Sequence, residues 1–180
     1  TEIALHAGNP YAAEQAATIW IELEPDSADA RQTIAALLIN LGKLDAAKPH
    51  LEKLLSSEKD NVGGAFMQLN QLLSRNPNKV EALQLIQQLS QPYKDFPEVH
   101  FATSQAAWFA NQHQLALDEM QRALALRPDW EIAAIHNGRI LQRTSNAEAS
   151  DYYRDYLKKY PAANEVRIAY ARTLITDGRN

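Results

Sequence analysis

An alanine recurs at a nearly constant interval along the chain, and this repeat constrains the fold more than any other feature. The intervals are 34, 35, 34 and 33 residues, and the alanines are Ala13, Ala47, Ala82, Ala116 and Ala149. Five residues before each alanine stands a glycine, a polar residue or, once, a proline: Gly8, Gly42, Pro77, Asn111 and Thr144. Twelve residues after three of the alanines stands a proline: Pro25, Pro128 and Pro161. The repeat predicts that each period holds a helix, a short turn, a second helix and a short connection.

Apolar residues within a period follow helical spacing. Between Ala30 and Leu41 they stand at intervals of three and four, and the segment from Ala46 to Leu55 repeats this pattern. Pro49 is expected in a first helical turn, where its missing N–H costs little. The polar residues expected to cap second helices are Asn9, Asp45, Asn78 and Asn146. No alternating strand pattern is present, so we predict an all-α fold.

The recurrent alanine has a physical explanation. It stands near the start of each second helix, where the first helix of the same hairpin would cross closely and leave no room for a larger side chain. A single hairpin cannot bury its apolar face, so stability is expected from neighbouring hairpins that stack in a line. We therefore expect residues 1–180 to form one array.

The stretch from Ala28 to Asn61 resembles a tetratricopeptide repeat (TPR), a helix-turn-helix unit of about 34 residues. Its matches to the family pattern are Ala35, Leu38, Gly42, Ala47 and Leu54, while Lys59 replaces the usual proline. The family's bulky fourth-position aromatic is mostly missing, which suggests a divergent bacterial member. The resemblance implies an α-solenoid of stacked antiparallel hairpins in a right-handed superhelix. The expected repeats are 1–27 (partial), 28–61, 62–96, 97–130, 131–163 and 164–180 (partial or capping).

Both ends of the sequence fall inside predicted repeats. Only the tail of a first helix, Thr1 to Ala7, precedes the first turn, and Gly178 stands at a turn position. Asn164 to Thr176 are then expected to form a lone first helix, which can serve as a cap. We favour the alternative that the chain is a piece of a longer array, whose ends can self-associate.

Composition narrows the classes of partner. The net charge of −4 gives no general attraction to nucleic acid or to an anionic membrane. No cysteine is present, so a disulfide, a thiolate metal site and a cysteine nucleophile are excluded. No window resembles a signal peptide or a membrane span, and we expect no direct membrane insertion. Cytoplasmic and periplasmic locations are both compatible with this composition.

Catalytic chemistry is not indicated. The five histidines form no zinc motif, and the glycine pair Gly63-Gly64 is expected to be a repeat junction. The acidic pairs on predicted second helices, Asp118 with Glu119 and Asp151 with Asp155, are expected to be solvated at the outer surface. We predict no enzyme, no catalytic residue, no metal and no cofactor.

The resemblance places ligand contacts on the first helices, at the positions that line the family's concave face. The predicted groove residues are Gln71, Arg75, Phe101, Gln105, Trp108, Arg139, Gln142, Arg143 and Arg172. Aromatic rings are rigid anchors and arginines pair with carboxylates, so the expected guest is an extended apolar and acidic peptide. The alternative is that the rings pack between repeats and the arginines are solvated. The family's lysine and asparagine clamp for a C-terminal carboxylate is not reproduced.

Three functional classes follow. We favour a protein–protein interaction scaffold that binds a protein or peptide partner in its groove. The second class is the binding or regulatory arm of a larger enzyme or of a secretion or assembly protein. The third, an RNA-binding helical repeat, is disfavoured by the acidic total and by the absence of a base-reading pair in each repeat.

Overall fold

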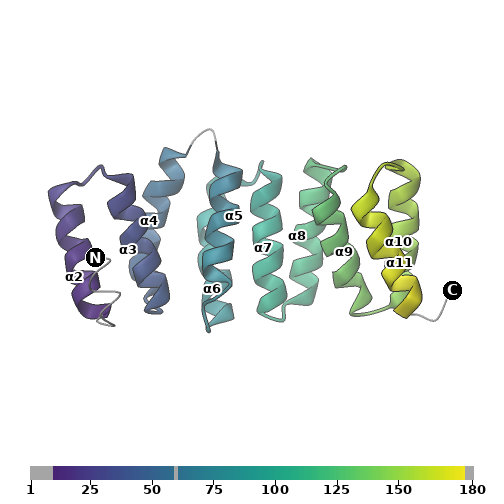
Figure 1. Ribbon diagram of the computed structural model, residues 1–180, viewed down its shortest axis with the longest axis horizontal. Helices are drawn as coiled ribbons and strands as arrows, with labels where there is room; N and C mark the ends of the chain where they lie inside the picture. Colours follow the sequence, from purple (N-terminus) through teal and green to yellow (C-terminus); the bar gives the residue numbers. More distant parts are fainter. Residues whose placement is uncertain (1–9, 59–60, 177–180) are drawn as a thin grey trace. The chain divides into compact units, whose positions relative to one another are not determined.

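The computed structural model describes residues 10–58 and 61–176, and this part of the chain is helical (Figure 1). The α-helices are α2 (Pro10–Leu23), α3 (Ala28–Asn40), α4 (Leu44–Ser57), α5 (Val62–Leu73), α6 (Lys79–Ser90), α7 (Pro97–Phe109), α8 (His113–Leu126), α9 (Glu131–Gln142), α10 (Asn146–Lys159) and α11 (Asn164–Thr176). A short 3-10 helix, η1 (Gln91–Tyr93), follows α6. The predictions made for Thr1 to Ala7, Gly8, Asn9, Lys59 and Gly178 lie outside the described residues.

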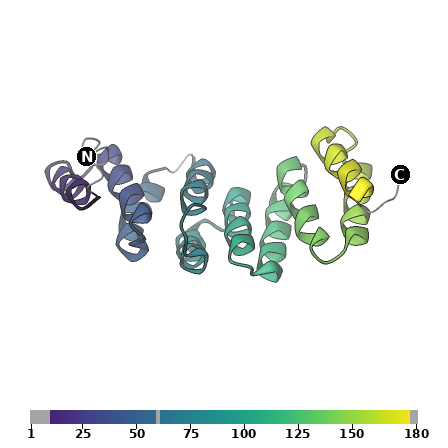
Figure 2. The same cartoon turned by 60° about the horizontal axis from the view of Figure 1, so that its bottom comes forward.

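The helices form successive pairs, which confirms the predicted all-α fold of helix-turn-helix hairpins (Figure 2). Each pair lies within the limits of one predicted repeat, and the predicted lone helix from Asn164 to Thr176 is α11. The chain forms two compact units, residues 1–93 and residues 94–180, which we call the N-terminal unit and the C-terminal unit.

The turn inside a hairpin requires a left-handed residue at two of the predicted positions. Gly42 has a φ of 72° after α3, and Asn111 has a φ of 58° after α7. These are the residue types that adopt this conformation at the lowest cost. The reversal lets the next N–H groups bond back to the helix, as the Lys43 N–H does to the Leu38 carbonyl at 2.8 Å.

Helix caps only partly follow the prediction. Asn78 caps α6 as expected, because its side chain accepts a hydrogen bond from the Glu81 N–H. The predictions for Asp45 and Asn146 are wrong, since both lie in the first turn of their helices. Ser145 holds the cap of α10 and accepts from the Glu148 N–H at 3.2 Å. Serine at the preceding position makes this bond as well as asparagine would, so the cap moves by one residue.

The five recurrent alanines are all buried, as the repeat predicted. In the N-terminal unit, Ala13, Ala47 and Ala82 are at most 4% exposed, and the ring of Phe66 meets that of Tyr93 edge-on at 5.7 Å. Methyl-sized side chains here let the helices of a hairpin approach closely, so a larger residue would force them apart.

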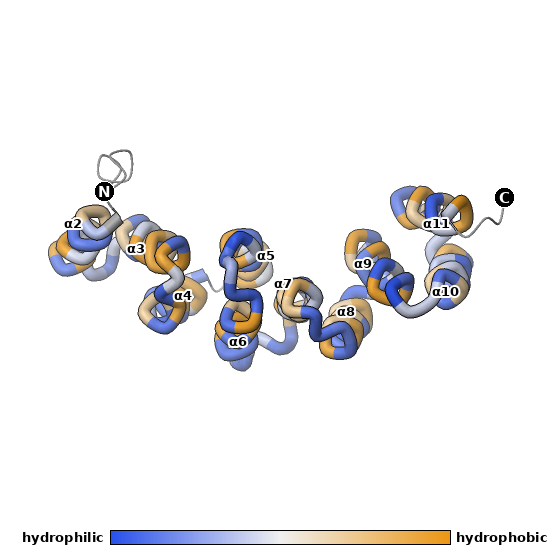
Figure 3. The backbone as a smooth tube through the Cα atoms, turned by 90° about the horizontal axis from the view of Figure 1, so that it is seen from below, coloured by the Kyte–Doolittle hydropathy of each residue, from blue (hydrophilic) through white to orange (hydrophobic). Residues whose placement is uncertain are grey.

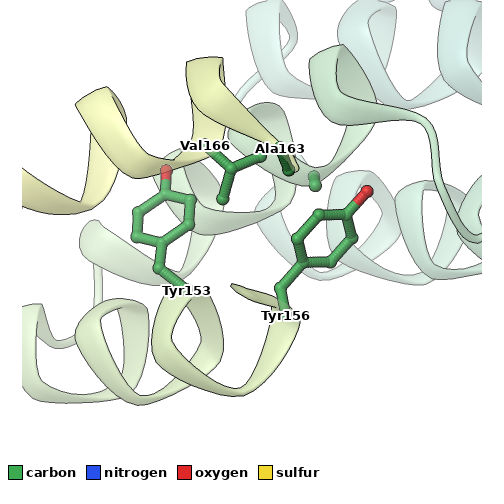
Figure 4. Close-up of a cluster of buried hydrophobic side chains, with 5 residues drawn as sticks. Tyr153, Tyr156, Ala163 and Val166 are labelled. Carbon is green, nitrogen blue, oxygen red and sulfur yellow. The ribbon is translucent and has the colours of Figure 1, made fainter. Parts of the chain in front are cut away.

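The core at the end of the C-terminal unit is built around tyrosine (Figure 4). Tyr153 and Tyr156 of α10 pack with Val166 of α11. The ring of Tyr153 lies over Gly138 of α9, where an added Cβ would come within 2.1 Å of the ring Cζ atom. Its hydroxyl donates to the Ile135 carbonyl at 3.0 Å. Gly138 thus provides the space that the large ring fills.

His100 of α7 and Glu119 of α8 are buried against each other, and the exposed side chain of Arg122 reaches Glu119 from the surface. The Nδ1 atom of His100 lies 2.7 Å from a carboxylate oxygen of Glu119, and its Nε2 atom lies 2.8 Å from the Lys94 carbonyl. The second oxygen of Glu119 accepts from Arg122 at 2.6 Å. The bond to Glu119 raises the pKa of His100 despite the opposing effect of burial. The prediction that Glu119 is solvated is therefore wrong, because His100 and Arg122 compensate its charge inside the unit.

Candidate functional site

The first helices of the C-terminal unit, α7, α9 and α11, lie on one side of it, and α8 and α10 lie on the other (Figure 3). This arrangement brings seven of the nine predicted groove residues into one unit, on α7, α9 and α11 or directly after them. The other two, Gln71 and Arg75, belong to the N-terminal unit, where both are exposed. We therefore take the first-helix face of the C-terminal unit as the candidate site.

A small cavity between α9 and α11 brings together three of the predicted residues. Its volume is about 150 Å³, and its lining includes Arg139, Gln142 and Arg172. Both arginines are exposed, and neither forms an ion pair with any other described residue. Two guanidinium groups without a carboxylate partner make the cavity strongly attractive to an anion.

The hydroxyl groups of the cavity have donors already in use. Thr173 donates to the Ala169 carbonyl at 3.1 Å, and Thr176 donates to the Arg172 carbonyl at 2.9 Å. Hydrogen-bond donors for a guest therefore come from the two guanidinium groups and from the amide of Gln142. This donor-rich arrangement suits a carboxylate, which has only acceptors to offer.

His136 stands one turn before Arg139 on α9 and adds no positive charge at neutral pH. Burial, and to a lesser degree the Arg139 guanidinium, lowers its pKa to about 4. The side-chain nitrogen of Gln105 on α7 lies 3.1 Å from the Nε2 atom of His136 on α9, so this contact joins the two helices. Gln105 is thus held by His136 at the edge of the site.

Trp108 and Arg143 form the second group of predicted residues. The guanidinium carbon of Arg143 lies 5.7 Å from the centre of a Trp108 ring, within reach of a cation–π contact, and His113 meets the indole edge-on at 5.2 Å. The Trp108 ring is half-buried, so part of its surface is accessible to a guest. The contacts with Arg143 and His113 hold the ring in place.

The prediction that Phe101 is a groove anchor is wrong. Only 1% of this residue is exposed. Its ring packs against Trp130 at 4.8 Å and against His136 at 5.5 Å, so it belongs to the core between neighbouring repeats. The indole that covers Phe101 belongs to Trp130, in the connection from α8 to α9.

Exposed apolar side chains replace Phe101 on the site. They stand at first-helix positions outside the nine predicted residues, and they are Phe109, Ile132, Ile168 and Ile175. Ile132 is 59% exposed and Ile175 is 69% exposed, which is costly for isoleucine unless something covers it. These residues stand at the same kind of first-helix position that identified the arginines as groove residues. Their place on the groove was therefore predictable from the sequence.

Carboxylates of these first helices lie only in the opening turns, away from the arginines. Glu98 pairs with Arg127, and Glu131 accepts from the backbone N–H groups of Glu165 and Val166 at the start of α11. Among the described residues, the C-terminal halves of α9 and α11 therefore contain arginines and no carboxylate. Arg139 lies in the last turn of α9 and also interacts favourably with the helix dipole, so part of its role is structural.

The described residues contain no helix that is long and apolar enough to cross a membrane. No protein-family profile matches the sequence, and no curated protein matches it significantly.

Solved structures do match. A tetratricopeptide repeat protein from Parabacteroides merdae has a TM-score of 0.58 at 14% identity, with 99% of this chain and 71% of that chain covered. TTC0263, a TPR protein of Thermus thermophilus, has a TM-score of 0.54 at 17% identity, covering 96% of this chain and 95% of that one. YrrB, a TPR protein with an unusual peptide-binding site, has a TM-score of 0.53 at 18% identity, covering 93% and 87%. The chain therefore has the fold of tetratricopeptide repeat proteins.

Proposed function

We propose that the chain is a protein-interaction module whose C-terminal unit binds an extended segment with acidic and apolar side chains. The observation that carries this proposal is the cavity lined by Arg139, Gln142 and Arg172, whose arginines have no acidic partner among the described residues. An acidic side chain of the guest would place its carboxylate between the two guanidinium groups, which donate in pairs.

The exposed apolar side chains of the same two helices define the rest of the guest. Ile168 and Ile175 lie on α11, on either side of Arg172 in sequence, and Ile132 opens α9. Apolar residues of the guest would cover them and gain about 25 cal/mol for each Å² removed from water. A guest with an acid flanked by apolar residues therefore fits better than a purely acidic one.

The likeness to YrrB supports the same class of function, since that protein is described as having a peptide-binding site. The role of binding arm in a larger enzyme or assembly is compatible with this site, because the contacts would be the same. No described feature of the C-terminal unit favours a catalytic role over binding.

The test begins with selection of peptides from a random display library on the purified chain. We expect enrichment of sequences in which an acidic residue is flanked by aliphatic or aromatic residues. The best peptide is then labelled, and its binding is measured by fluorescence anisotropy at two ionic strengths. Affinity should fall as salt increases, because the arginines and the guest carboxylate are exposed.

Variants locate the site. Arg139→Gln and Arg172→Gln should each weaken binding about tenfold or more, as expected for a hydrogen bond between charged groups. The matched control is Arg154→Gln, which removes the same charge from α10, on the other side of the unit. Equal affinities for all three variants, with native circular dichroism, would refute this site. A selection that enriches no acidic peptides would refute the proposed guest.

A further inference from the structure

Arg143 is a further arginine of the first-helix face that has no acidic partner. Its side chain is exposed, and it forms no ion pair with any other described residue. Its backbone continues the helical conformation of α9, with φ −63° and ψ −29°, so it stands one turn after Arg139. Like charges one turn apart repel each other, and the C-terminal half of α9 contains no carboxylate to offset them. An acidic guest would remove this repulsion.

Trp108 of α7 holds the Arg143 side chain in place. The guanidinium carbon lies 5.7 Å from the centre of the indole ring, within the range of a cation–π contact. A guanidinium group is planar, and its N–H donors lie in its own plane. An indole over its face therefore leaves these donors available to a carboxylate. A side chain that is already held loses less entropy when a guest binds, so Trp108 acts as a positioning residue for Arg143.

Arg139 and Arg143 serve opposite sides of α9. This helix lies between α7 and α11 on the first-helix side of the unit (Figures 1 and 3). Arg139 lines the cavity shared with Arg172 of α11, whereas Arg143 contacts Trp108 of α7. The two subsites therefore lie on either side of one helix, and packed helices are spaced about 8–10 Å apart.

This spacing sets a requirement on an extended guest. An extended chain advances about 3.3 Å per residue, and its side chains alternate between two faces. Residues i and i+2 point to the same side about 7 Å apart, and residues i and i+4 do so about 13 Å apart. These two separations bracket the distance across α9, whereas residues at odd separations point to opposite sides.

We propose that the guest carries two acidic residues, two or four positions apart, and that Arg143 binds the second. The first carboxylate lies between Arg139 and Arg172, and the second accepts hydrogen bonds from the Arg143 guanidinium while Trp108 holds it. This inference rests on the proposed function, because it adds a second contact to the same face. It narrows the guest from a segment with one acid to a segment with two acids in a defined spacing.

Synthetic peptides labelled with rhodamine test the spacing. Each is a serine peptide with a leucine near either end and one glutamate, and a second glutamate stands one, two, three or four positions after the first. Binding to the full chain is measured by fluorescence anisotropy. The peptides with even separations should bind about three- to tenfold more tightly than the single-glutamate peptide, the range for one added ion pair with a charged hydrogen bond. The peptides with odd separations carry the same net charge and should gain less.

Variants assign the second contact. Arg143→Gln should abolish the gain from the second glutamate and leave the affinity for the single-glutamate peptide nearly unchanged. Trp108→Leu should reduce this gain, and Trp108→Phe should restore part of it because a ring remains beside the guanidinium. A merely structural role of Trp108 would weaken both kinds of peptide equally. Arg154→Gln on α10 is the control of equal charge and should keep the full gain.

The outcomes separate this inference from the proposed function. A single-glutamate peptide that binds as tightly as every two-glutamate peptide, and loses affinity in Arg139→Gln, would overturn the second subsite and leave the proposed function standing. An equal gain at all four separations, or a gain that survives in Arg143→Gln, would also overturn it. Tighter binding of a peptide with one phosphoserine than of any two-glutamate peptide would assign the arginines to a phosphate instead. Failure of all the peptides to bind at millimolar concentration would refute the proposed function together with this inference.

Discussion

Replacing Gly138 with alanine should destabilise the C-terminal unit, although alanine is the better helix former. Gly138 lies inside α9, where the gain in helix propensity is about 0.8–1.0 kcal/mol. The new methyl group would meet the Tyr153 ring, with Cζ at 2.1 Å, the hydroxyl oxygen at 2.3 Å and Cε1 at 2.5 Å. These separations are far shorter than contacts between carbon atoms, which lie at about 3.5–4.0 Å. The ring or the helix must move.

The change in the free energy of unfolding caused by Gly138→Ala combines two unfavourable contributions and one favourable contribution. Overpacking of a buried site costs about 1–3 kcal/mol, and displacement of the ring loses the hydrogen bond from Tyr153 to Ile135, about 0.5–1.5 kcal/mol. After subtraction of the propensity gain, the free energy of unfolding should fall by about 0.5–3.5 kcal/mol. Urea unfolding followed by far-ultraviolet circular dichroism measures this change.

Gly64→Ala is the matched control. Its new methyl group would also come close to a neighbour, at 2.3 Å from a side-chain oxygen of Asn61. That neighbour is exposed and can rotate away, so the control should be neutral or slightly stabilising. A double variant with Gly138→Ala and Tyr153→Leu should lose less stability than the two single changes together, because the shorter side chain leaves room. Gly138→Ala as stable as the wild type would refute the close packing of this ring on α9.

Two further predictions concern other parts of the C-terminal unit. Ala116→Leu, at a fully buried position, should lower the melting temperature far more than Ala125→Leu, at an exposed position. Circular dichroism measures both melting temperatures, and an equal decrease for the two variants would contradict the repeat register. The raised pKa of His100 contributes stability that is complete below the unfolded-state value of 6.5 and is lost as pH rises through the folded value. Urea titrations across neutral pH should therefore show decreasing stability, with a smaller slope in Glu119→Gln; an identical slope would exclude this ion pair as the cause.

The fold was largely predictable because its determinants are local and repeated. The small residue at the hairpin crossing and the left-handed residue at the turn each recur at a fixed interval, as Ala47 and Gly42 illustrate. The Ser145 cap was missed because serine and asparagine stand side by side and either can make the bond. The burial of Glu119 was missed because its partner His100 lies on another helix, 19 residues away.

The candidate site was less predictable, because exposure depends on neighbouring repeats. Phe101 and Trp108 both stand at groove positions, yet Trp130 covers the first and the second stays half-exposed. The repeat pattern gives the direction in which a side chain leaves its helix but not the bulk that the next repeat places over it. The meeting of Arg139 with Arg172, 33 residues apart, follows from the repeat itself and was within reach of the sequence.

The most direct test of the proposed binding face is hydrogen–deuterium exchange of the chain with and without an acidic, apolar peptide selected on it. Binding between the first helices should slow exchange in the C-terminal halves of α9 and α11, around Arg139 and Arg172, and leave α8 and α10 unchanged. The same protection should disappear in a variant with both arginines replaced by glutamine. Protection confined to α8 and α10, or protection that survives in this variant, would contradict the assignment of the arginine-lined cavity as the binding site.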